Sequence, residues 1–201
     1  MNFKLDLKNI FYLMRFFESD DRNAVAIVFE RINRAGTELN KFDLLSAWSW
    51  SEEFNLKEKF ESLDLELESY GYANLSSDKD LQLKICSAII NGETTPAAIL
   101  HLSGNEVRGR FKEVISGIKG AIDFLRNELL VYSFEILPYP ALLIPLATYF
   151  ATTKTDGEKY TDRQREKITQ WFWISVFSKR YSSDVNNRQR KDILDLLAIK
   201  K

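Results

Sequence analysis

Cysteine and histidine are almost absent from this chain, which has one of each among 201 residues. A single cysteine cannot form an internal disulfide, and we expect Cys86 to be a buried, unreactive thiol in a reducing compartment. One cysteine and one histidine cannot supply the clustered ligands of a zinc site, so we expect no metal site. His101 is the only imidazole available as a general base, and we expect an ordinary structural or surface role for it.

Glycine and proline are also scarce, at 8 and 4 residues. So few chain breakers favour long helices over a sandwich or barrel with many turns. Aromatic residues make up 13% of the chain, which indicates a real core and excludes a disordered segment. No stretch alternates in the manner of a strand. We therefore predict an all-α fold, an irregular multi-helix bundle of about seven or eight helices.

No membrane or secretion signal is recognisable. The stretch Met1–Lys8 alternates charged and apolar residues and has no small-residue cleavage site. The longest uncharged stretch, Ile136–Thr153, has 18 residues, the lower limit for a membrane span. Three prolines interrupt it, which predicts a kinked core helix. We expect a cytoplasmic protein with no membrane partner.

Apolar residues recur at helical spacing in several stretches that capping residues delimit. Ser77 is the predicted start of one helix, and Gly71 and Gly92 are predicted to end two others. Gly109, Gly117 and Gly120, inside the longest expected helix, are predicted to allow close approach of a neighbouring helix. The segments expected to be helical are 10–17, 25–32, 41–49, 51–70, 80–90, 105–132, 139–150, 162–177 and 188–199.

Motifs for catalysis are missing. The chain has no glycine-rich phosphate loop and no nucleophile elbow. Carboxylates are plentiful, and seven of them with two lysines give Glu52–Glu68 a balance of −5. We interpret this stretch as a solvated acidic helix face. The chain is not expected to be an enzyme by itself, although its activity stays an open question.

A first candidate site lies where two arginines precede a glycine turn. Arg31, Asn33, Arg34 and Gly36 lead into the start of the next helix. Guanidinium groups and backbone N–H groups at such a place can bind an anion or a nucleotide. The alternative is an ordinary helix C-terminus, where arginine complements the helix dipole and glycine ends the helix.

A second candidate site is a polar, basic segment with an aromatic residue. Between Ser178 and Lys191 there are five cations and one aspartate, a local balance of +4. Such a segment can follow a phosphate backbone, or it can be a solvated helix junction. The candidates for contact with a DNA backbone are Lys179, Arg180, Tyr181, Ser182, Arg188, Arg190 and Lys191.

Three segments carry a family resemblance. The first, Phe29–Leu39, resembles the F-E-R-I-N-x-x-G-x-x-L signature of the ParB-like, GmrSD-type family of modification-dependent restriction and phage-defence proteins of bacteria and archaea. Trp171–Trp173 and Phe177–Ser182 are similar to a second signature of that family, and Lys191–Ile193 to a third. The order and separation of the three signatures agree with the family.

The resemblance implies a division at residue 50. Residues 1–50 would be the truncated end of the ParB-like core, a helix–glycine–helix unit, and residues 51–201 a helical domain. The family's Asp-Gly-x-Gln-Arg motif, linked to nucleotide hydrolysis, and its HNH nuclease part are absent. The chain thus looks like the middle of such a protein, as a fragment, a truncated gene or one half of a split system. We expect no cofactor in this chain, whereas NTP and Mg²⁺ belong to the full-length parent.

Two functions remain open. In the first, the chain is the helical portion of a GmrSD-type protein that contacts DNA or relays nucleotide state, without being catalytic alone. Its partners would be DNA and the missing N-terminal or nuclease part as a separate chain. In the second, it is a helical protein–protein interaction module with no nucleic-acid role. Apolar surface exposed by truncation would favour a homo-oligomer in either case.

Overall fold

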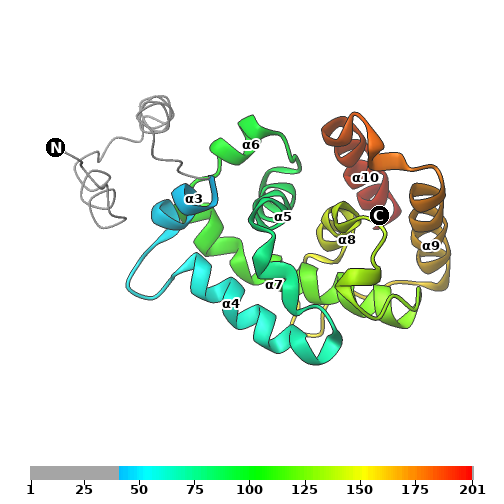
Figure 1. Cartoon of the computed structure of the whole chain (residues 1–201), viewed down its shortest axis with the longest axis horizontal. Coiled ribbons are helices and arrows are strands. Elements are labelled where there is room, and N and C mark those ends of the chain that lie inside the picture. Colours follow the sequence, from blue (N-terminus) through cyan, green and yellow to red (C-terminus); the bar gives the residue numbers. More distant parts are fainter. Residues whose placement is uncertain (1–40, 201) are drawn as a thin grey trace.

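The structure is a computed structural model that describes residues 41–200 (Figure 1). Within these residues the chain forms eight α-helices and five short 3-10 helices, and the only β contact is an isolated bridge between Ser51 and Phe54. The predicted all-α, multi-helix fold is confirmed. The α-helices are α3 (Lys41–Ser49), α4 (Leu56–Leu67), α5 (Lys79–Asn91), α6 (Pro96–Leu100), α7 (Gly104–Asn127), α8 (Leu143–Phe150), α9 (Asp162–Phe177) and α10 (Val185–Lys200).

The expected helices at 10–17 and 25–32 lie outside the described residues. The same holds for the first candidate site, Arg31, Asn33, Arg34 and Gly36.

Helices α7 and α8 form the centre of the molecule (Figure 1). All eight residues of α8 are buried, as its uniformly apolar sequence predicts. A Cβ added at Gly117 of α7 would lie 2.3 Å from the carbonyl oxygen of Ala147. A Cβ at Gly120 would lie 2.7 Å from the Cβ of Phe150. The predicted close approach of a neighbouring helix is confirmed at these two glycines, but it is wrong for Gly109, where an added Cβ would meet nothing within 4 Å.

The helix expected at 139–150 begins later than its apolar pattern suggests. The first turn is the 3-10 helix η4 (Pro140–Leu142), and the α-helix starts only at Leu143. Tyr139 before it is extended, as a residue preceding proline prefers to be. No helix within residues 41–200 is both long enough and apolar enough to cross a membrane.

The long helix α7 begins with a capping box, in which Ser103 and Glu106 each accept a hydrogen bond from the other's backbone. It ends at Asn127, five residues before the expected end at 132. The reason is a turn: Leu130 is left-handed, with φ of 57°, and the Val131 N–H donates to the carbonyl of Leu125 at 2.8 Å. Buried Leu129 keeps the helical spacing although the helix is over.

Helix α4 also starts later than predicted. Asn55 caps it by accepting a hydrogen bond from the Lys57 N–H at 3.1 Å, so residues 51–55 precede the helix. Gly71 and Gly92 are left-handed, at φ of 80° and 74°, and they end helical segments as predicted. The predicted cap of α5 is wrong by one residue, because Asp78 rather than Ser77 accepts from the Leu81 N–H.

Helices α9 and α10 complete the right-hand end of the molecule in Figure 1. The bounds of α9 match the prediction, and a capping box of Thr161 and Gln164 begins it. Helix α10 starts at Val185, three residues earlier than expected, and packs on α8. Lys200 near its end donates to the carbonyl of Tyr149 at 2.8 Å, which ties α10 to the end of α8. Helix α4 runs along the lower side of the molecule in this view (Figure 1).

Candidate interaction site at the junction of α9 and α10

The chain reverses between α9 and α10 through two left-handed residues. Lys179 and Asp184 both have φ of 50°, and the 3-10 helix η5 (Arg180–Ser182) lies between them. This reversal places the end of α9 beside the second turn of α10. Arg180 and Tyr181 of the second signature therefore come into contact with Asp192 of the third.

A buried ion pair holds the junction together. The Arg180 Nε lies 2.8 Å from both carboxylate oxygens of Asp192, and its Nη2 lies 2.6 Å from Oδ1. The Tyr181 hydroxyl donates to the Asp192 Oδ2 at 2.7 Å. Asp192 is 0% exposed, so its charge is neutralised inside the protein. Burial and the Asp192 charge raise the pKa of Tyr181, and the hydrogen bond to Asp192 raises the pKa of Arg180.

Two further candidate cations also make internal contacts. The Arg188 Nη1 donates to the carbonyl of Arg180, and the Arg190 Nε pairs with Glu93 at 3.2 Å. Three of the seven predicted DNA-contact residues, Lys179, Ser182 and Lys191, are exposed and make no side-chain ion pair or hydrogen bond within residues 41–200.

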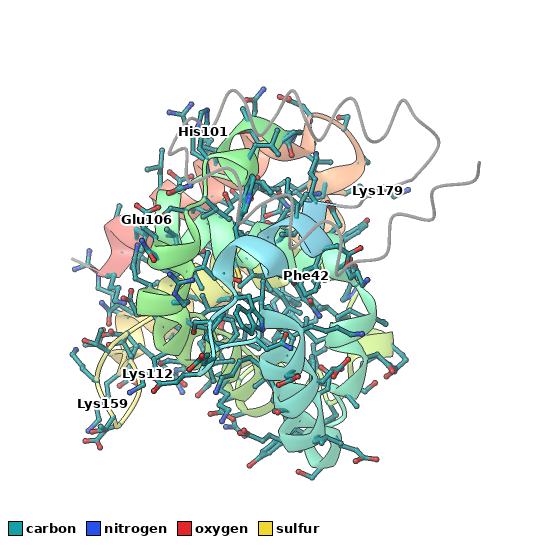
Figure 2. The ribbon with its side chains drawn as sticks, turned by 90° about the vertical axis from the view of Figure 1, so that its left-hand side faces the viewer. Phe42, His101, Glu106, Lys112, Lys159 and Lys179 are labelled. Carbon is teal, nitrogen blue, oxygen red and sulfur yellow. The ribbon has the colours of Figure 1, made fainter. Side chains whose placement is uncertain are left out.

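In Figure 2 the labelled Lys179 side chain lies at the outer edge of the view. The structure thus brings the second candidate site together, but four of its seven residues point their polar groups at the protein. Contact with DNA stays a prediction.

An open groove of about 640 Å³ runs between α9 and α10. Trp171, Ile174 and Leu196 supply apolar lining, while Lys167 and Lys191 are on the wall. The lining also includes Ser175 and the Arg180–Asp192 pair. The buried Trp171 Nε1 and Ser175 Oγ have no hydrogen-bond partner in the described part of the chain. A volume of this size is within the range of ligand and side-chain pockets.

Beside the groove, α9 carries three exposed apolar side chains, which we call the α9 face. Trp173, Ile174 and Phe177 are 38%, 55% and 79% exposed. The rings of Trp173 and Phe177 stack at a centroid distance of 5.7 Å and an interplanar angle of 23°. Phe177 lies one helical turn after the adjacent residues Trp173 and Ile174, so the three side chains form a single patch. Large apolar side chains gathered in this way mark an interaction surface.

The helical period explains why the α9 face is exposed. Four consecutive apolar residues, Trp171–Ile174, span more than one side of a helix at 100° per residue, so they cannot all face one core. The helix buries Ile168, Phe172 and Ser175 and leaves the α9 face outward. Counting this period would have identified the exposed patch.

Cys86 lies in the core and His101 at the surface. Cys86 is 0% exposed, as predicted, and burial raises the pKa of its thiol to about 12, which disfavours the reactive thiolate. His101 is exposed, at the surface in Figure 2. Within residues 41–200 no three histidine, cysteine, aspartate or glutamate residues gather in a way that could hold a metal ion.

Comparisons with known proteins give one similarity. The chain is similar to an uncharacterized protein of Methanocaldococcus jannaschii, with 24% identity over 199 residues. The match covers 89% of this chain and 31% of that protein, so the chain spans less than a third of its relative's length. No protein-family model matches the chain, and no solved structure matches it.

Proposed function

We propose that this chain is the helical, non-catalytic portion of a GmrSD-type restriction or phage-defence protein, and that it acts by binding another polypeptide through the α9 face. The observation that carries the proposal is the exposure of Trp173, Ile174 and Phe177 on adjacent turns. Aromatic residues are enriched at the centres of protein interfaces and dominate their binding energy.

The arrangement of the signature residues supports the family assignment within this proposal. Arg180 and Tyr181 come from the second signature and Asp192 from the third, and all three meet in one hydrogen-bonded cluster. If the residues of two signatures build one junction, that junction is a physical reason for the order and spacing of the signatures. The 31% coverage of the Methanocaldococcus jannaschii protein is consistent with a portion of a longer protein.

Contact with DNA is the second candidate, because Lys179, Ser182 and Lys191 are exposed at the same junction. Two lysines give weak, salt-dependent attraction to phosphates. A mobility-shift assay at low ionic strength, with modified and unmodified duplexes, separates the two candidates. The interaction proposal expects no shift. A shift that Lys179→Ala with Lys191→Ala removes would instead support DNA contact.

Photo-crosslinking tests the interaction proposal directly. A benzoylphenylalanine side chain replaces Phe177 in one variant and Ile136 in a control, in cells that carry the native locus. Ile136 is 58% exposed and belongs to η3 (Phe134–Ile136), away from α9. We expect position 177 to crosslink to a polypeptide of the same locus, identified by mass spectrometry, and position 136 to give no such product. Crosslinking of position 177 to DNA, or to nothing, would contradict the proposal.

A further inference from the structure

The charge of the chain is divided unevenly between two segments. The whole chain has a net charge of −1, yet residues 52–68 carry −5 and residues 162–195, with eight cations and five acidic residues, carry +3. The first range covers α4, which runs along the lower side of the molecule in Figure 1, and the second covers α9 and most of α10 on the right. Opposite charge on two separate surfaces of one molecule favours encounters in which the acidic surface of one copy meets the basic surface of another.

The acidic segment, residues 52–68, has a regular stripe of side chains on one side of α4. Glu58, Glu61, Leu65 and Glu68 follow one another at spacings of three or four residues, so they share a helix face. All four are exposed, and Leu65 is 75% exposed. This α4 stripe is therefore one apolar side chain flanked by exposed carboxylates, of which Glu61 also forms an exposed ion pair with Lys57 at 3.8 Å and Glu58 accepts a hydrogen bond from Asn55.

The basic segment, residues 162–195, has a groove whose charge and apolar lining complement this stripe. Lys167 and Lys191 line opposite walls of the α9–α10 groove, and neither makes an ion pair within residues 41–200. Asp195 also lines the groove, whereas Asp192 is neutralised by Arg180. The groove therefore combines an apolar lining with two lysines against one unneutralised carboxylate. An acidic helix with one protruding leucine fits this chemistry.

We infer that the partner of the α9 face is a second copy of this chain, whose α4 stripe docks in the α9–α10 groove. Leu65 of one copy enters the groove next to Ile174, and the glutamates of the stripe face Lys167 and Lys191. The inference rests on the proposed function, because the groove adjoins the α9 face and shares Ile174 with it. The two surfaces differ, so the contact is heterologous and each copy keeps one free surface for the next.

The expected association is weak and sensitive to salt. A stable interface buries about 800 Å² on each partner, and one helix stripe against one groove supplies only part of that area. Much of the attraction comes from exposed charges, which salt screens. We expect the average mass to rise with protein concentration at low ionic strength and to fall toward the monomer at high ionic strength.

Mixing variants tests this arrangement by sedimentation velocity. The donor variant, Glu61→Gln with Leu65→Ser, loses the α4 stripe. The acceptor variant, Ile174→Ser with Lys191→Gln, loses the groove. All four side chains are exposed, so both variants are expected to fold, which circular dichroism checks. Ile136→Ser is the matched control and should associate as the wild type does.

Each variant alone should stay monomeric, and an equimolar mixture should form a 1:1 dimer and nothing larger. The dimer forms because one intact stripe meets one intact groove. A wild type that stays monomeric at every concentration would overturn the inference. A mixture that stays monomeric although the wild type associates would also overturn it, because it would indicate a two-fold contact.

The result separates this inference from the proposed function. If position 177 crosslinks to a different polypeptide of the locus while the wild-type chain is monomeric, the proposed function stands and the second-copy inference falls. If position 177 crosslinks to no polypeptide although the mixed variants dimerise, the proposed function fails by itself.

Discussion

Replacing Asp192 by alanine tests the structural role of the α9–α10 junction. The substitution removes the acceptor of four contacts: three at 2.6–2.8 Å from Arg180 and one at 2.7 Å from Tyr181. It leaves a guanidinium group without its charge partner and a buried hydroxyl without an acceptor. Removing one partner of a buried ion pair costs about 3–5 kcal/mol of unfolding free energy.

The expected loss lies at the lower end of that range. The Asp192 side chain is 1% exposed, but that of Arg180 is 26% exposed, so water can solvate part of the freed charge. We expect Asp192→Ala to lower the unfolding free energy by roughly 3 kcal/mol, out of the 5–15 kcal/mol typical of a domain. Urea unfolding followed by circular dichroism and tryptophan fluorescence measures the change.

Arg190→Ala is the matched control. Arg190 pairs with Glu93 at 3.2 Å, and both side chains are substantially exposed, at 58% and 36%. Exposed pairs contribute at most about 1 kcal/mol, so this variant should unfold nearly as the wild type does. If Asp192→Ala costs no more than Arg190→Ala, the junction does not depend on the ion pair. Arg180 would then be available to a ligand, and our account of the second signature would be wrong.

Three further predictions concern helix packing, pH and capping. Gly117→Ala should destabilise the protein by about 1–3 kcal/mol, because the added Cβ meets the α8 backbone. Gly109→Ala should instead stabilise the protein by up to about 1 kcal/mol, because nothing lies within 4 Å of the added Cβ. Urea unfolding of both variants measures the two changes. The hydrogen bond from Arg110 lowers the pKa of Glu113. This bond therefore stabilises the folded protein above the unfolded-state pKa of Glu113, and the stabilisation is lost as the pH falls through the folded-state pKa. Glu113→Gln should therefore have a lower urea midpoint than the wild type at neutral pH and an equal one in acid. Thr161→Ala should lower the thermal midpoint, since losing an N-cap costs about 0.5–2 kcal/mol, and Thr161→Ser should restore it.

Local signals in the sequence predicted much of the fold. Gly71 and Gly92 end helical segments because a left-handed residue there needs no Cβ. The bounds of α9 follow from a threonine cap and an unbroken helical pattern. The end of α7 was not predictable in this way, because Leu130 takes a left-handed conformation that a leucine rarely adopts.

The candidate site was less predictable because charge counts do not show which charges are paired. The segment from Ser178 to Lys191 has a balance of +4, but Arg180 is neutralised by Asp192 twelve positions later, and Arg190 by Glu93 from a different helix connection. Only the chain reversal at Lys179 and Asp184 brings such groups together. Burial of single residues of α9, in contrast, follows from the helical period and was within reach of the sequence.

The proposed phage-defence function predicts that the native locus protects cells from phage, and this protection tests the central claim, that the α9 face acts by binding a polypeptide. Plaque counts compare the wild type with Phe177→Glu, with Ile136→Glu as the control of equal chemistry, and with Lys179→Ala plus Ser182→Ala, two exposed residues that do not line the groove. Blotting confirms equal protein levels. We expect Phe177→Glu to abolish protection while Ile136→Glu and the Lys179 and Ser182 double variant keep it. Full protection with Phe177→Glu, or loss of protection only with the double variant, would contradict this expectation.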